Sequence, residues 1–110
     1  MNKKYTTRKG RKLSNLIKNK ILKSFPHLKD EDVAVAGTGE NGPDIKLSRI
    51  GKRLIPYQIE AKSQQRLSTV YTWYKQAGKK TNLEPIVCMR QNGKNPLVVM
   101  SLDHFFELIK

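Results

Sequence analysis

The sequence has little negative charge. Only 9 aspartates and glutamates stand against 22 lysines and arginines, which gives a formal net charge of +13. The shortage is sharpest in residues 1–29, which contain no acidic residue at all. Such an excess of positive charge says little about the fold, but it indicates a polyanionic partner. Nucleic acid is the first candidate, and a membrane surface is a distant second.

Cysteine and long apolar runs are also scarce. The one cysteine, Cys88, excludes an internal disulfide framework and a cysteine-based zinc site. Because it lies in the apolar run 85–89, we expect it to be a small core residue. No apolar run approaches the roughly 20 residues that span a bilayer. We therefore expect a soluble, cytoplasmic protein that does not enter a membrane.

The first helix is predicted for residues 11–24 and ends before Pro26, since the residue before a proline avoids the helical region. Its apolar residues fall at i, i+3, i+4 and i+8 on one face: Leu13, Leu16, Ile17 and Ile21. Residues 1–10 lack this periodicity and carry many positive charges, so they are predicted to form a flexible basic arm.

The rest of the chain predicts strands at 33–36, 44–50 and 54–62, a helix at 66–79, strands at 85–90 and 97–100, and a helix at 102–109. A hairpin turn is expected at 49–53, and Ser101 is the expected N-cap of the last helix. This α-β-β-β-α-β-β-α order favours an α/β fold, with a mixed β-sheet flanked by helices, in a single domain of residues 1–110.

Three residues that can carry chemistry are predicted to meet at one end of the sheet. Asp44 opens one strand, and Glu60 and Lys62 lie near the end of the next. Antiparallel pairing would place the start of the first strand beside the end of the second. Glu60 and Lys62 share a face because side chains alternate along a strand. Two carboxylates and an ammonium group thus converge.

Hydrolysis of a phosphodiester bond uses groups of this kind. Asp44 and Glu60 would bind Mg²⁺, with Mn²⁺ as a substitute, and the backbone carbonyl of Ala61 would be a further ligand. Lys62 would orient the attacking water or balance charge on the phosphate. The alternative is a surface ladder of salt bridges with no catalytic role.

The residues Gly42-Pro43-Asp44-Ile45, followed after fifteen positions by Glu60-Ala61-Lys62, resemble the PD-(D/E)XK nuclease superfamily. The segment after this motif resembles the small Holliday-junction-resolvase-like branch, so the resemblance covers most of residues 11–110. It implies a restriction-endonuclease-like core and a homodimer that presents two sites to branched DNA. A small nuclease of this kind would suit a bacteriophage or a mobile element.

The chain departs from this family at one point. Many relatives carry an additional acidic residue on the first helix, and residues 11–29 offer none. Either the site works with two carboxylates, or another acid contributes. Glu40 is the preferred candidate, and the run Asp30, Glu31 and Asp32 is the alternative. The number of bound metal ions stays open.

Several other side chains are predicted to contact DNA. Gln64 and Gln65 directly follow the motif and are candidate neighbours of the site. Basic residues supply most non-specific affinity for DNA through phosphate contacts. The predicted contacts are Lys3, Lys4, Arg8, Lys9, Arg11, Lys12, Lys46 and Arg66.

The sequence thus predicts a metal-dependent endonuclease that hydrolyses DNA phosphodiester bonds, acting on branched DNA such as Holliday junctions. One rival is a nuclease of the same fold that acts on nicked, flapped or linear DNA. A rival from another class is a non-catalytic basic protein that binds nucleic acid. It explains the charge equally well, but it does not explain why two acids and a lysine converge.

Overall fold

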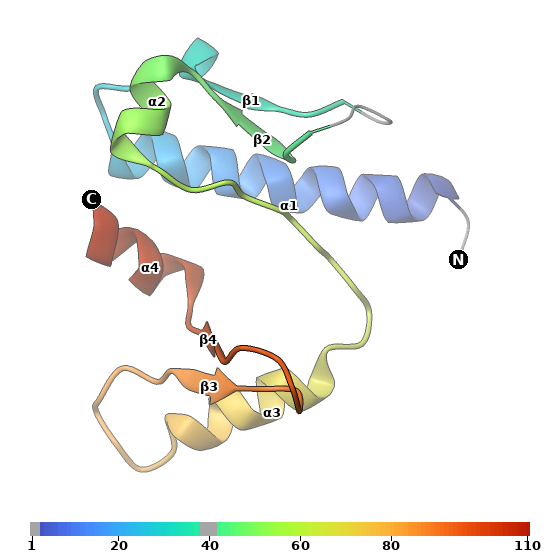
Figure 1. Ribbon diagram of the computed structural model, residues 1–110. Helices are drawn as coiled ribbons and strands as arrows, with labels where there is room; N and C mark the ends of the chain where they lie inside the picture. The colour runs from blue at the N-terminus through green and yellow to red at the C-terminus, as the bar shows by residue number, and fades with distance from the viewer. Residues whose placement is uncertain (1–2, 38–41) are drawn as a thin grey trace. The chain divides into compact units, whose positions relative to one another are not determined.

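The computed structural model describes residues 3–37 and 42–110 (Figure 1). In this part, the protein is a small α/β protein with four α-helices and two separate two-stranded antiparallel sheets. The chain divides into two compact units: residues 1–64 with 106–110 form the first unit, and residues 65–105 form the second unit. No helix of the described residues is long and apolar enough to cross a bilayer.

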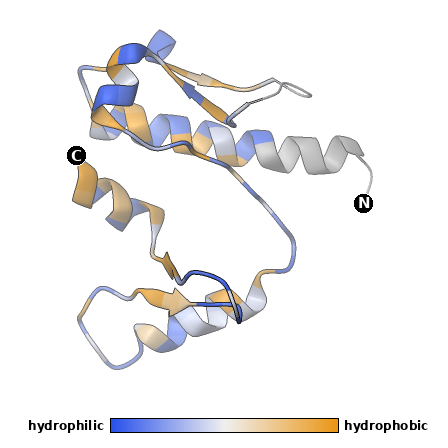
Figure 2. Cartoon of the chain, in the orientation of Figure 1, coloured by the Kyte–Doolittle hydropathy of each residue, from blue (hydrophilic) through white to orange (hydrophobic). Residues whose placement is uncertain are grey.

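The first unit begins with α1 (Lys3–Ser24), which ends where the sequence predicts but starts earlier. The flexible arm predicted for residues 1–10 is therefore helical from Lys3 on, and residues 1–2 lie outside the described range. Residues 1–10 show no apolar periodicity, so the sequence did not predict a helix there. Lysine and arginine nevertheless favour helix formation by their intrinsic propensity. From residue 11 on, α1 mixes hydrophobic and hydrophilic residues (Figure 2).

The core of the first unit lies between α1 and a short sheet. β1 (Val33–Val35) pairs antiparallel with β2 (Ile45–Leu47), and α1 packs against β1. Of the predicted helix stripe, Ile17 and Ile21 are buried, whereas Leu16 is 46% exposed. The buried hydrophobic residues are Ile17, Ile21, Phe25, Leu28, Val33, Ile45, Ile55 and Phe106.

The predicted hairpin turn at 49–53 is wrong, because these residues belong to the helix α2 (Arg49–Leu54). Ser48 is its N-cap, and the Ser48 hydroxyl accepts a hydrogen bond from the N–H of Gly51 at 3.1 Å. The predicted strand 54–62 does not form either: residues 55–62 form no helix and pair with no strand. The predicted mixed sheet is thus replaced by two separate antiparallel pairs.

Ser48 also joins α2 to the short 3-10 helix η1 (Asp30–Asp32). Its hydroxyl donates to the Asp32 carboxylate at 2.8 Å, and its N–H donates to the Asp32 carbonyl at 2.8 Å. Gly51 is buried against this contact, and a Cβ there would lie 3.3 Å from the Asp32 carbonyl oxygen. We call these hydrogen bonds among Asp32, Ser48 and Gly51 the Ser48 clasp. The clasp fixes the point at which the chain leaves β2.

The second unit contains α3 (Ser68–Ala77), β3 (Val87–Met89) and β4 (Leu97–Val99), and the division between the units falls within α4 (Leu102–Ile109). β3 and β4, which fall within the predicted strands 85–90 and 97–100, form an antiparallel hairpin whose turn includes Gly93 at a φ of 79°. Ser101 is the predicted N-cap of α4, since its hydroxyl accepts from the His104 N–H at 3.1 Å.

Apolar side chains of the second unit are more exposed than the sequence predicts. Cys88 is exposed, so its assignment to a core is wrong. It pairs across the hairpin with Val98, which is 52% exposed, and side chains of directly paired residues lie on the same face of a sheet. Throughout residues 65–105, all of which the structure describes, no hydrophobic side chain is fully buried.

We expect Ser48→Ala to destabilise the protein by about 1 kcal/mol, as loss of an N-cap hydroxyl usually does. Urea unfolding followed by circular dichroism measures the change. Ser63→Ala is the matched control in the same unit, because Ser63 lies outside any helix or strand. Equal stability of the two variants would contradict a structural role for the Ser48 clasp.

Acid should weaken the clasp. The hydrogen bond from the Lys29 N–H, followed by that from the Ser48 hydroxyl, lowers the pKa of Asp32 below its ordinary value of 3.8. A lowered folded-state pKa adds stability above the unfolded pKa, and this contribution is lost as the pH falls through the folded value. Urea midpoints measured below about pH 4 should therefore fall more steeply for the wild type than for Asp32→Asn.

Candidate active site

Asp44 stands at the start of β2, after a turn that glycine makes most easily. Gly42 has a φ of 105°, a left-handed conformation that strains other residues. Pro43 then restricts the backbone further, because its ring fixes φ. The Asp44 carbonyl accepts a hydrogen bond from the Ala36 N–H at 3.0 Å, which ties this position to the end of β1. The backbone around Asp44 is therefore well anchored.

The Asp44 side chain contacts the backbone of the predicted Glu-X-Lys motif. Its Oδ2 accepts a hydrogen bond from the N–H of Ala61 at 2.6 Å, in a partly buried setting. Such a short bond to a carboxylate is stronger than a bond between neutral groups. The structure thus brings Asp44 to the peptide that separates Glu60 from Lys62. The Asp44 carboxylate meets the backbone between Glu60 and Lys62 through a side-chain hydrogen bond and not through the predicted sheet.

Glu60 and Lys62 form an ion pair with each other. The distance between Lys62 Nζ and Glu60 Oε1 is 3.4 Å, and the two side chains are 73% and 71% exposed. Water screens a pair this exposed, so it contributes little to stability. Both charged groups can therefore exchange this contact for a ligand at small cost.

The oxygen atoms near this contact are of the kind that a hard divalent cation binds. Asp44 and Glu60 would supply carboxylate oxygens, and Ala61 would supply a backbone carbonyl. Mg²⁺ favours such oxygen ligands and retains several waters, so one or two carboxylates are sufficient. Within the described part of the chain, no group of three His, Cys, Asp or Glu side chains is arranged to hold a metal. Glu40, the preferred third acid, lies outside the described residues.

The other acids considered for the site have different contacts. Asp30 pairs with Lys18 at 3.0 Å. The Asp32 carboxylate accepts hydrogen bonds from the Lys29 N–H at 2.7 Å and from Ser48. Asp32 therefore has a structural role in the Ser48 clasp. This role could have been suspected from the sequence only if Ser48 had been recognised as a helix cap.

The predicted DNA contacts lie on several elements. Arg11 and Lys12 are exposed on α1, and Lys46 is exposed on β2. Gln64 is the exposed last residue before the second unit, which begins with the exposed Gln65 and Arg66. Four further predicted DNA contacts belong to α1, but the structure does not describe their side chains: Lys3, Lys4, Arg8 and Lys9.

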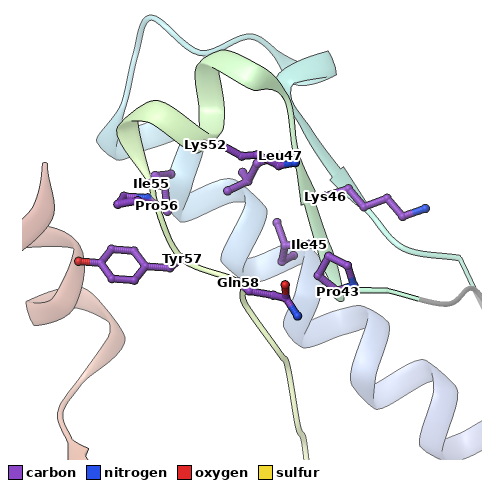
Figure 3. A pocket seen from close by; sticks show the side chains of 9 residues that line it. All are labelled: Pro43, Ile45, Lys46, Leu47, Lys52, Ile55, Pro56, Tyr57 and Gln58. Atoms are coloured by element: carbon purple, nitrogen blue, oxygen red, sulfur yellow. The ribbon is translucent and has the colours of Figure 1, made fainter.

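Beside Asp44 lies an open groove that the sequence does not predict. It has a volume of about 560 Å³ and runs between β2 and residues 55–58 (Figure 3). The expected pairing of these two segments would have closed it. Its lining residues are Pro43, Ile45, Lys46, Leu47, Lys52, Ile55, Pro56, Tyr57 and Gln58.

Comparisons with protein-family models, with curated proteins and with solved structures found no match to this chain.

The contact between Asp44 and Ala61 predicts a measurable change in hydrogen exchange. We expect Asp44→Ala to speed exchange of the Ala61 amide by about tenfold, because a bond to a charged group contributes roughly 1.5–3 kcal/mol. Asp44→Asn should preserve most of the protection, since its amide oxygen can still accept the bond. NMR-detected exchange measures both variants. An Ala61 amide that exchanges at the same rate in all three proteins would contradict this geometry.

Proposed function

We propose that this protein is a metal-dependent endonuclease that hydrolyses DNA phosphodiester bonds. The observation that carries the proposal is the 2.6 Å hydrogen bond from the Ala61 N–H to Asp44 Oδ2. It sets one carboxylate against a segment that offers a second carboxylate and an ammonium group. Glu60 and Lys62 flank that peptide and stay largely exposed, so both charged groups are accessible to a ligand.

The charge of the chain supports DNA as the substrate. With 22 basic and 9 acidic residues, the protein carries a net charge of +13, which favours binding of polyanions. Each phosphate that a lysine or arginine neutralises releases condensed counterions, which favours binding. Arg11 and Lys12 on α1 and Lys46 on β2 are exposed and placed in the same unit as Asp44. They would position the backbone of the strand without reading its sequence.

The residues of the site then have separate roles. Asp44, Glu60 and the Ala61 carbonyl would hold Mg²⁺ or Mn²⁺, which when bound polarises the phosphate and acidifies a water. The hydrogen bond from Ala61 orients the Asp44 carboxylate. Lys62 would leave Glu60 for the phosphate and stabilise the negative charge that develops on its oxygens. Breaking the Glu60–Lys62 ion pair costs little free energy because both side chains are largely exposed.

The finer proposals concern fold and substrate. The motif Gly42-Pro43-Asp44-Ile45 with Glu60-Ala61-Lys62 supports a relationship to restriction-endonuclease-like nucleases. In this chain, α2 and an unpaired extended segment stand where that core would have a hairpin turn and a third strand. On the basis of the motif we propose a nuclease related to the Holliday-junction resolvases, which cuts branched DNA as a homodimer with two sites.

Cleavage of a synthetic four-way junction tests the proposal. The wild type should cut the junction in Mg²⁺ and not in EDTA, and Glu60→Ala should lower the rate by at least about a hundredfold, as loss of a metal-binding carboxylate does. Linear duplex and single-stranded DNA, run in parallel, show which structure is preferred.

Glu107→Ala is the matched control, because Glu107 forms a comparable exposed ion pair with Lys110 at 2.8 Å. It should cut at the wild-type rate. Tight binding of every substrate without any cleavage would overturn the proposal and favour a non-catalytic protein that binds nucleic acid. Preferential cleavage of linear or nicked DNA would retain the nuclease and overturn the branched substrate.

A further inference from the structure

The groove beside Asp44 has an apolar floor. Ile45 and Ile55 are 3% and 0% exposed and form its base, with Leu47 beside them. The ring of Pro43 and the Gln58 side chain lie at one end (Figure 3). The volume of about 560 Å³ falls within the roughly 300–1,000 Å³ of small-ligand sites. A flat, mostly apolar group of moderate size fits such a space.

The polar groups of the groove define the chemistry of its occupant. Lys46 and Lys52 are the charged residues of the lining, which contains no acid. Lys52 reaches from α2 toward Leu47 on β2, so its ammonium group lies at the end of the groove away from Pro43 (Figure 3). Gln58 supplies an amide that can both donate and accept hydrogen bonds. The occupant therefore combines an anionic group with a flat ring whose edge forms hydrogen bonds.

The groove adjoins the candidate active site along two segments of the chain. Asp44 lies between Pro43 and Ile45, which both line the groove. On the other side, Gln58 lies two positions before Glu60 in the same extended segment. A strand that places a phosphate at Asp44 and Glu60 would thus have its neighbouring nucleotide at the mouth of the groove.

We propose that this groove binds one unpaired nucleotide of the DNA strand, next to the bond that is cleaved. The base lies on Ile45 and Leu47 with its edge on Gln58, and its phosphate binds Lys52. A base within a duplex cannot enter, because it is stacked and paired. This inference rests on the proposed nuclease function and deepens it, since a nucleotide beside the scissile bond, such as one at the crossover of a branched DNA, must then leave its pairing partner to enter the groove.

Binding measured in EDTA, where no cleavage occurs, tests the groove separately from the nuclease. Two fluorescein-labelled duplexes differ only by one bulged, unpaired nucleotide, and fluorescence anisotropy gives the affinity for each. The wild type should prefer the bulged duplex. Gln58→Ala should weaken binding to it by about tenfold, as loss of a hydrogen-bonded base contact does, and should leave the paired duplex unchanged.

The control variants are chosen at exposed positions of the second unit. Gln91→Ala is the match for Gln58→Ala, and Lys75→Ala is the match for Lys52→Ala. Lys52→Ala should weaken binding to the bulged duplex several-fold and lower its salt dependence by about one counterion. Gln58→Glu keeps the side-chain size but replaces the N–H donors that meet the edge of the base with a carboxylate that only accepts, so it should abolish the preference.

Equal binding of both duplexes by the wild type would overturn the inference, and so would a Gln58→Ala variant that binds both as the wild type does. An apolar peptide segment would then be the better occupant. The two proposals fail separately. Preference for the bulged duplex without cleavage of any DNA would support nucleotide binding in the groove and contradict the nuclease function. Cleavage without this preference would support the nuclease function and contradict nucleotide binding in the groove.

Discussion

The position of the candidate site depends on one hydroxyl group. The Ser48 hydroxyl donates a hydrogen bond to the Asp32 carboxylate and accepts one from the Gly51 N–H. It therefore acts as donor and acceptor within the fold. The first bond holds the end of β2 to η1, and the second starts α2. Because α2 begins there, the chain turns away from β2 and returns as the extended segment 55–62. The Ala61 N–H then reaches Asp44. A different start for α2 would change where that segment runs.

Local signals explain what the sequence predicts correctly. Pro26 ends α1 at Ser24, and Ser101 caps α4 as expected. The convergence of Asp44 with the Glu60–Lys62 segment was also predicted, from their spacing. The path of the chain between these two segments was not predicted. Glycine within 49–53 suggested a turn, whereas Gly51 lies in α2 and its N–H donates a hydrogen bond to Ser48. The apolar character of 85–90 suggested burial. Whether a face is covered depends on tertiary packing, which a short apolar run does not reveal.

Four acids of the first unit contact lysines or the backbone. Asp30 and Glu60 pair with lysines at the surface, and Asp32 and Asp44 accept backbone N–H groups. The carboxylates of the two surface pairs are largely exposed, so salt and water weaken the pairs. In the first unit positive charge exceeds negative charge, so a polyanion that approaches it is attracted on balance.

Burial is distributed unevenly between the two units, and this has a consequence for how the protein binds. Every fully buried hydrophobic side chain of the described residues belongs to the first unit. Residues 65–105 have correspondingly little hydrophobic free energy to oppose the entropy of their chain. They should open locally at a lower free energy than the first unit. A ligand that orders residues 65–105 must offset the conformational entropy that they lose. Part of its interaction energy is then used for this ordering, so its affinity is lower than its contacts alone would give.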